Sequence, residues 1–600
     1  MLLLENTKQK NRINEATMSQ AFWGMFPALV IANIIPALSN VINGLIVGNS
    51  YTEEAMSAIS FATPVLKFVG AGAVLAASGA NIVYGRYLGR GDSEKIHKVF
   101  TADIEIVLIL GTTLTLLGEL FIPQIVHLIG ATGEISIETI RYFRGLFIGF
   151  IPTLLIPSLV AFLNLGNEAK YGMASSAILA GANLLLGLIN VHVLKGTMFG
   201  MGLVSSMSQY MAVIFLIRKF IKRKELGHIV KITGEKQIVK DILFLGIPAA
   251  ILEIATSFRN IVINAETLKA GGTFAAQAMG ILASSSGFFC AVLPAAITTT
   301  TTIMSITVGE GNAHYLKKEA SYLLKTSAII CITTGLCYFL FSPWISMIFG
   351  AKGISITYGN MCIRLYCIEL FIGWFFFVLL GIYQTLRRMK LYIIMQILSI
   401  LVYPTATIFL FRGLLGIVGI WLCYGIAAFL SSITLVIVSW IKNKKFPKSI
   451  SDMLWLDNNF DVSEENRFSI TVNSLDDVVK IAKNVQDFCI NRGIDEKKAL
   501  FMAICLEEMA GNIISHGFTK ASNKKQKSLV IDISIAISDS EVLARIRDNA
   551  PHFDPFKKLE MYQLKIEDPS KNIGIRIVSK MAKEMKYQST LGMNVLSIKM

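Results

Sequence analysis

Charged residues are scarce in this chain, and their scarcity indicates its class. Of the 600 residues, 16% are charged and 53% are hydrophobic, and the mean hydropathy is +0.58. Soluble domains carry about 25% charged residues. Because the deficit lies in the first three quarters of the chain, we expect a polytopic membrane protein there. The formal net charge of +15 is then assigned to cytoplasmic loops, and a nucleic-acid surface is not expected.

Three sequence signals are also missing. The eight cysteines form no CxxC pair and have no histidine at ligand spacing, so we expect reduced packing residues and no metal site. There is no GxxxxGKS/T motif, which argues against ATP-driven pumping. The first long apolar run begins at Ala21 and is too long for a signal peptide, so no cleavable signal is expected.

Long apolar stretches are what the sequence does contain. Residues 21–48 hold no charged side chain, and they exceed the ~20 residues that cross a bilayer core. The stretch also includes residues that interrupt or polarise a membrane helix: Pro27, Pro36, Asn33, Asn40 and Asn43. Such residues are tolerated where they face protein or a water-filled cavity. The pattern therefore predicts a working helix of a transporter or channel rather than a single anchor.

Twelve such stretches are expected to span the membrane. They lie at residues 21–48 and at about 57–84, 101–122, 142–164, 173–194, 200–218, 241–264, 275–308, 322–341, 360–381, 391–411 and 415–441. In this count the basic loops, among them residues 85–98 and 218–240, fall on one side. The positive-inside rule then places both termini in the cytoplasm. The second stretch is rich in Gly and Ala, which predicts close helix packing.

The two halves of this region resemble each other. The tetrapeptide LFIG at Leu146–Gly149 recurs at Leu370–Gly373, and the Gly-x-Gly turn at Gly89–Gly91 recurs at Gly309–Gly311. The two recurrences have nearly the same separation. They indicate two parallel six-helix repeats, with a substrate site between them.

Residues 15–445 resemble the multidrug and toxin extrusion (MATE) transporters. The resemblance rests on SNVINGLIVG at the end of the first helix, LGRGD at 88–92, and DILFLGIPAAILEIATSFRNIVIN from residue 241. It implies a Na⁺- or H⁺-coupled antiporter that exports amphipathic organic cations by rocking two six-helix lobes. Asn40 and Asn43 are then expected on the transport path. Asn43 stands where bacterial relatives often carry Asp, and an amide cannot titrate.

Two carboxylates lie inside the expected spans of the second half. The MATE resemblance implies a cation-coupling carboxylate on span 7 and another on span 10, which makes Glu253 and Glu369 the candidates. Tyr366 precedes Glu369 by three residues and shares its helix face. Intramembrane charges face a cavity or a partner. The alternative is therefore that each carboxylate pairs with an arginine on the same two helices, Arg259 or Arg364.

The composition changes after Lys448, where charges become frequent and apolar runs become short. Strands are expected at 467–472, 528–536, 542–547 and 594–599, and helices at 474–491, 496–516 and 574–584. The first of these helices has a Ser-x-x-Asp cap. This order predicts an α+β sandwich with helices on one face of a mixed sheet.

One helix of this domain carries a chemical pattern. Glu508, Asn512 and His516 are spaced four residues apart, so they share one helical face. An amide oxygen on this face could hold Mg²⁺, and a carboxylate could act as general base. The alternative is a solvated polar stripe.

Three segments together resemble the ATP-binding fold of histidine kinases, Hsp90 and gyrase, in its anti-sigma-factor serine kinase variety. They are LEEMAGNIISHG at 506–517, RDNAPHFDP at 547–555 and NIGIRIV at 572–578. The resemblance implies that Asn512 ligates Mg²⁺, Glu508 is the general base, Asp548 receives the adenine amino group and Gly574 borders the phosphates. His516 and Phe553 are expected in the same nucleotide pocket. The first loop lacks the Gly-x-Gly of many relatives, so protein serine kinase activity and ATP binding alone both stay open.

The predicted fold is an all-α membrane bundle of twelve helices in two repeats, followed by an α+β sandwich of the histidine kinase/Hsp90 type. Its parts are a cytoplasmic tail (1–20), lobe 1 (21–220), a basic loop (221–240), lobe 2 (241–445), a linker (446–463) and an ATP-binding domain (464–600). The predicted function is cation-coupled export of organic or xenobiotic compounds across the cell membrane. The domain would bind ATP with Mg²⁺ and have a regulatory role, for example by phosphorylating a small partner protein. Two alternatives are a membrane-bound serine-kinase sensor that binds ligand without exporting it, and a flippase for lipid or glycan precursors.

Overall fold

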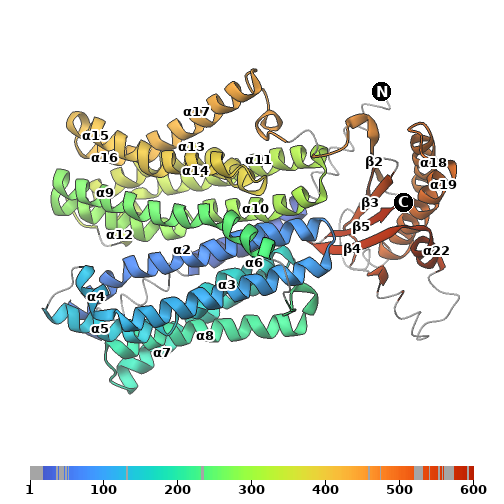
Figure 1. The fold of residues 1–600 in the computed structure, drawn as a ribbon. Helices are drawn as coiled ribbons and strands as arrows, with labels where there is room; N and C mark the ends of the chain where they lie inside the picture. The colour runs from blue at the N-terminus through green and yellow to red at the C-terminus, as the bar shows by residue number, and fades with distance from the viewer. Residues whose placement is uncertain are drawn as a thin grey trace.

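The computed structural model describes residues 18–35, 38, 46, 50–51, 53–129, 133–231, 236–349, 351–456, 460–472, 474–518, 531–538, 541–551, 554–556, 559, 573–590 and 593–600. Figure 1 shows a long bundle of helices and, at one end of it, a small sheet with helices packed on one face. We call the end of the bundle beside the sheet the sheet end, and the opposite end the far end.

The bundle divides into two lobes, drawn in blue to green and in green to orange in Figure 1. Lobe 1 consists of the helix Met18–Ile35, α2 (Glu53–Gly89), α3 (Ser93–Leu120), α4 (Ile122–Leu128), α5 (Gly133–Phe147), α6 (Phe150–Leu165), α7 (Ala169–Leu188) and α8 (Met198–Lys222). Lobe 2 consists of α9 (Lys236–Phe289), α10 (Val292–Glu310), α11 (Ala313–Leu340), α12 (Ser342–Ile348), α13 (Ile354–Thr385), α14 (Met389–Ile397), α15 (Tyr403–Leu415), α16 (Ile417–Trp421) and α17 (Cys423–Asn443).

Ten of the described helices are long and apolar enough to cross a membrane, or eleven segments if the bent pair α5 and α6 is one span. The chain is a multi-pass membrane protein. The seventh and eighth spans, expected at 241–264 and 275–308, have different boundaries in the structure. α9 contains two helices joined at Gly272, whose φ is 63°, and α10 begins after a second break near Cys290. α9 is not among the ten helices, and it carries the charged Glu253 and Arg259.

The two lobes repeat the same local structure at the sheet end. α2 and α10 are each followed by a left-handed glycine, Gly91 or Gly311, with φ of 66° in both. The next helices, α3 and α11, each have 28 residues. Their N-cap residues are Asp92 and Asn312, whose side chains accept a hydrogen bond from the backbone N–H three residues on. Glycine adopts a positive φ at little cost, and the caps satisfy free helical N–H groups. The internal repeat is confirmed.

Lobe 1 and lobe 2 pack closely through glycines along the half of the bundle nearest the sheet. A side chain on Gly79 or Gly89 of α2, on Gly246 of α9 or on Gly309 of α10 would overlap backbone atoms of the helix opposite. Small residues allow membrane helices to approach this closely. We call this contact, formed by α2 on one side and α9 and α10 on the other, the inter-lobe seam. The close packing expected for the second apolar stretch is therefore present.

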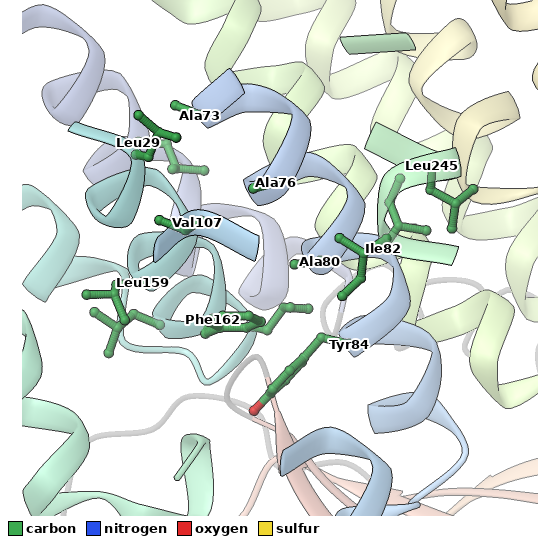
Figure 2. Close-up of a cluster of buried hydrophobic side chains, with 14 of the residues drawn as sticks. Leu29, Ala73, Ala76, Ala80, Ile82, Tyr84, Val107, Leu159, Phe162 and Leu245 are labelled. Carbon is green, nitrogen blue, oxygen red and sulfur yellow. The ribbon is translucent and has the colours of Figure 1, made fainter. Parts of the chain in front are cut away.

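The apolar core continues from the seam into lobe 1, as Figure 2 shows. Ile82 of α2 lies on the side of Leu245 from α9, whereas Tyr84 turns toward lobe 1. The ring of Tyr84 is 5.0 Å from that of Phe162, and its hydroxyl donates to the carbonyl of Leu226 at 2.6 Å. Burying the phenol is tolerated because its polar end is hydrogen-bonded.

The C-terminal part forms an α+β sandwich, as expected. Its elements are β1 (Arg467–Val472), α18 (Leu475–Ile490), α19 (Glu496–Asn512), β2 (Ile531–Ser538), β3 (Glu541–Asp548), α22 (Ile573–Met581), β4 (Glu584–Thr590) and β5 (Met593–Lys599). The strand order is β1-β2-β3-β5-β4, and the helices cover one face of the sheet (Figure 1). The expected cap at Ser474 is confirmed, because its hydroxyl accepts from the Asp477 N–H at 3.3 Å.

Two expectations for this part are wrong. The sheet is not mixed: each pair of neighbouring strands is antiparallel, with β2–β3 and β4–β5 formed by consecutive strands. The helix expected to reach residue 584 ends at Met581, and the unexpected strand β4 follows. The alternation of Met585 and Tyr587, which pack on the domain core, is typical of a strand with one buried face.

Candidate functional site

An ion pair joins the two lobes beyond the glycine contacts of the inter-lobe seam. Lys67 Nζ of α2 lies 2.6 Å from Glu253 Oε1 of α9. The pair lies about two helical turns beyond Gly246, toward the far end. The side chains are 54% and 29% exposed, so the ammonium and the carboxylate are both partly accessible. Glu253 of lobe 2 is therefore paired with the ammonium group of a lysine from lobe 1.

Polar contacts complete the closed part of the seam nearer the sheet. The Asn81 amide donates to Thr302 Oγ1 at 3.2 Å, and the Gln384 amide donates to Ser78 Oγ at 3.0 Å. Both bonds connect lobe 1 with lobe 2. Buried polar side chains need such partners, and these bonds are available only while the lobes touch. The structure is thus closed at the sheet end.

The second expected carboxylate lies in a charged and aromatic cluster inside lobe 2. Glu369 Oε1 of α13 lies 3.8 Å from Arg259 Nη1 of α9, and both side chains are largely buried. The Arg259 guanidinium lies 5.2 Å from the centre of the Tyr424 ring, and that ring is 5.0 Å from Tyr366. Glu369 Oε2 is buried without a hydrogen-bond partner among the described residues. Arg259 and the aromatic rings therefore surround a carboxylate that keeps one acceptor free.

The two carboxylates differ in whether they pair with an arginine, as the alternative interpretation expected. Glu369 has the arginine partner that the alternative reading expected. Glu253 has Lys67 instead, 186 residues away in the chain and in the other lobe. Arg364 donates to Ser342 Oγ at 3.2 Å rather than to a carboxylate. The other expected transport residues, Asn40 and Asn43, lie outside the described residues.

Three of the expected nucleotide-site residues lie together in the C-terminal domain. Glu508 and Asn512 are on one face of α19, and the first turn of α22 lies against them. A side chain on Gly574 would overlap Glu508 Oε2, and its Cβ would lie 3.5 Å from Asn512 Nδ2. Both side chains are half-buried, so they are not a fully solvated stripe.

Asp548 ends β3 on the helix-covered face of the sheet, in the buried register of that strand. Its Oδ1 accepts hydrogen bonds from Asn594 Nδ2 at 2.8 Å and from the Ala550 N–H at 2.9 Å. Burial raises the pKa of Asp548 to about 6, although both bonds favour the charged form. Asn594 was not predicted as a site residue. The only signal for it was an amide at the start of the last strand, and its register opposite Asp548 requires the sheet.

These residues fit an adenine nucleotide in two respects. The carboxylate of Asp548 is buried and keeps Oδ2 available to accept a hydrogen bond from a ligand amino group, since both of its bonds to described residues use Oδ1. The absence of a side chain on Gly574 lets the backbone at the start of α22 lie close to Glu508 and Asn512. The side chains of His516 and Phe553, which were also expected here, lie outside the described part of the chain.

These features define a class: a two-lobed membrane bundle joined to an α+β domain in which Glu508, Asn512 and Gly574 lie together. The chain belongs to the MatE family, whose profile matches residues 28–189 and 248–408, once in each lobe. Residues 471–600 match the histidine kinase-like ATPase domain. We call the C-terminal domain the ATPase domain below.

Curated relatives include the multidrug export protein MepA of Staphylococcus aureus (strain MRSA252), 26% identical over 255 residues, which are 42% of this chain and 56% of that protein. The corresponding protein of Staphylococcus saprophyticus is 26% identical over 278 residues, 44% of this chain and 59% of that protein. The matches therefore span little more than half the length of these relatives.

Solved structures share the fold of the bundle. A multidrug resistance MATE family transporter in an outward-facing conformation has a TM-score of 0.65 at 21% identity, over 69% of this chain and 93% of that one. A transporter of the same superfamily from Pyrococcus furiosus, described as having a binding pocket of reversed polarity, has a TM-score of 0.64 at 21% identity, over 70% of this chain and 96% of that one.

Proposed function

We propose that this chain is a Na⁺- or H⁺-coupled antiporter that exports amphipathic organic cations across the cell membrane. The observation that carries the proposal is the partly exposed Lys67–Glu253 ion pair between the two lobes. The curated relatives named as multidrug export proteins support the substrate class.

The ion pair suggests how cations are exchanged at this position. A charge inside a membrane is costly unless it is paired, and Glu253 is paired with the Lys67 ammonium. An organic cation at the seam competes with that ammonium for the carboxylate, and so does a coupling cation. Glu253 is then neutralised by one cation at each stage. Glu369, with Oε2 free beside Arg259, is the proposed second coupling carboxylate. Transport roles are also proposed for Tyr366 and, outside the described residues, for Asn40 and Asn43.

The basic loops support an orientation with the sheet end in the cytoplasm. The turn at Arg90 and Gly91, inside the basic 85–98 segment, lies at the sheet end, where Gly91 contacts Lys586 of β4. Positively charged loops face the cytoplasm. The sheet end and both chain termini are therefore assigned to the cytoplasm, with lobe 1 at 21–220, lobe 2 at 241–445 and the ATPase domain at 464–600.

The ATPase domain is proposed to bind ATP with Mg²⁺ and to regulate transport. Asp548 accepts the adenine amino group, Asn512 holds Mg²⁺, and the backbone at Gly574 borders the phosphates. Glu508 is placed to accept a proton as general base, which would permit phosphorylation of a small partner protein. Nucleotide contacts are also proposed for His516 and Phe553, whose side chains lie outside the described part of the chain. Bound nucleotide supplies the phosphoryl chemistry, and these side chains supply binding and orientation.

Uptake of a fluorescent organic cation into proteoliposomes, driven by a Na⁺ or H⁺ gradient, tests the transport proposal. The Glu253→Gln substitution keeps the shape of the side chain and removes its charge, so we expect gradient-driven flux to be lost. Glu266→Gln is the matched control, because Glu266 lies on the same helix but pairs with Lys269 and Arg412 instead. The control should retain flux.

Two results would contradict the proposal. Unchanged flux in Glu253→Gln would remove this carboxylate from transport. Ligand binding without gradient-dependent flux in the wild-type protein would indicate a sensor.

A further inference from the structure

The face of the C-terminal sheet that carries no helices lies against the sheet end of the bundle (Figure 1). Side chains alternate along β3, so that Val542, Ala544 and Ile546 are buried under the helices. Arg545 and Arg547 consequently point to the opposite face. Two arginines on an open sheet face require an acidic or aromatic partner if they are to be buried.

Lobe 2 supplies that partner. Arg547 forms an ion pair with Glu310, the last residue of α10, and the two side chains are only 11% and 3% exposed. The guanidinium also lies 4.1 Å from the centre of the Tyr315 ring of α11. A buried arginine needs both charge and packing compensation, and this site provides the two together. The sheet is therefore fixed to the turn between α10 and α11.

The linker strengthens the same contact. Asp461 Oδ2 accepts a hydrogen bond from the Ala313 N–H, at the start of α11, at 2.7 Å. Its Oδ1 pairs with Arg467, the first residue of β1. One carboxylate thus joins lobe 2 to the edge of the sheet opposite β4.

The same sheet face also contacts lobe 1. Lys586 of β4 packs on Gly91 so closely that a Cβ on the glycine would lie 3.0 Å from Lys586 Cβ. Beyond the end of β3, the Asn549 amide lies 3.5 Å from Gln20 Oε1 in the first helix. Gly91 is the repeat equivalent of Gly311, the glycine beside Glu310. The sheet therefore spans the equivalent turns of both lobes.

We propose that the helix-free sheet face is an intramolecular docking surface that clamps the two lobes together at the sheet end. The turns that it touches border the inter-lobe seam, where Gly89 and Gly309 pack against the opposite lobe. Separation of the lobes at this end must break the contacts to one of them. The clamp stabilises the conformation closed at the sheet end and slows its opening.

The clamp is also connected to the pocket of the ATPase domain. Arg547, Asp548 and Asn549 are consecutive: the first contacts lobe 2, the second lies in the proposed adenine site and the third contacts lobe 1. A ligand that shifts Asp548 necessarily acts on both neighbours. Occupancy of the pocket therefore changes the strength of the clamp. This second step depends on the proposed ATP binding, whereas the clamp itself does not.

Hydrogen exchange of the full-length protein in lipid nanodiscs tests the clamp. In Arg547→Ala, peptides covering residues 86–96 and 306–316 should exchange several-fold faster than in the wild type. Lys580→Ala, an exposed position on α22, is the control and should change neither peptide. Faster exchange in 306–316 alone would overturn the proposal, because it would show a local contact with lobe 2 and no effect across the seam.

Reversing the charges of Arg547 and Glu310 distinguishes loss of the ion pair from misfolding of a variant. Arg547→Glu and Glu310→Arg should each accelerate exchange in both peptides, and the double variant should slow it again, because the ion pair is re-formed with reversed polarity. Equal exchange in the single and double variants would contradict the clamp.

The nucleotide step is measured in the same experiment. Mg-ATP should alter hydrogen exchange in both peptides of the wild type. In Asp548→Asn, Mg-ATP should leave the exchange of both peptides unchanged. If the protein binds no ATP, the nucleotide site is refuted. Faster exchange of both peptides in Arg547→Ala would still support the clamp in that case. ATP binding without any effect on either peptide would refute the connection between the pocket and the clamp.

Discussion

At the scale of single residues, the partner of a charge determines its possible role. Glu253 and Glu369 are both intramembrane carboxylates on lobe 2, yet one pairs with a lysine from the other lobe and the other with Arg259 of its own lobe. The first pair is partly exposed at the seam, whereas the second is buried. Competition by an external cation is therefore expected at Glu253 first.

Replacement of Lys67 tests this competition. Lys67→Gln removes the ammonium that occupies Glu253, so organic cations should bind more tightly. A partly exposed ion pair contributes about 0.2–1 kcal/mol, which corresponds to a decrease in the apparent KM of up to about five-fold. The measurement is the concentration dependence of gradient-driven flux in proteoliposomes. A higher KM in this variant would show that Lys67 assists cation binding instead.

At the scale of elements, the inter-lobe seam depends on glycines that face backbone. α2 meets α9 in antiparallel register, and Gly79 and Gly246 allow their backbones to touch. Side chains of any size would separate the helices there. Gly280, in the second of the two helices that α9 contains, has open space at the position of its missing side chain.

These two glycines provide a matched comparison. Gly246→Leu should destabilise the protein by about 1–3 kcal/mol, because the new side chain overlaps the Leu75 backbone. Gly280→Leu should leave the stability nearly unchanged. The measurement is thermal unfolding of both variants in the same detergent. An equal loss of stability in the two variants would contradict the close backbone packing proposed for Gly246.

Most of the elements could be predicted from the sequence, because their signals are local. Apolar length indicates membrane helices, and Ser474 with Asp477 marks the start of α18. The strand β4 was missed because its pattern continues directly from that of α22. The partners of the charged residues could not be predicted at all. Lys67 meets Glu253, and Arg547 meets Glu310, only after segments far apart in the chain are folded together.

At the scale of the whole molecule, two repeated lobes and one soluble domain meet at the sheet end. The lobes touch through the seam, and the ATPase domain contacts both of them through Gly91 and Glu310. In the proposed transport function, the closed sheet end and the partly exposed Lys67–Glu253 pair belong to one state of an alternating-access cycle. The opposite state requires the seam to open.

A cross-link across the seam tests that requirement most directly. Asn81 and Thr302, hydrogen-bonded between the lobes at 3.2 Å, are replaced by cysteines in a chain whose exposed Cys337 is changed to serine. A short thiol cross-linker that a reductant can cleave then joins the lobes, with each single-cysteine variant as control. We predict that cross-linking stops gradient-driven export of the organic cation and that reduction restores it. Full export by the cross-linked protein would contradict the account.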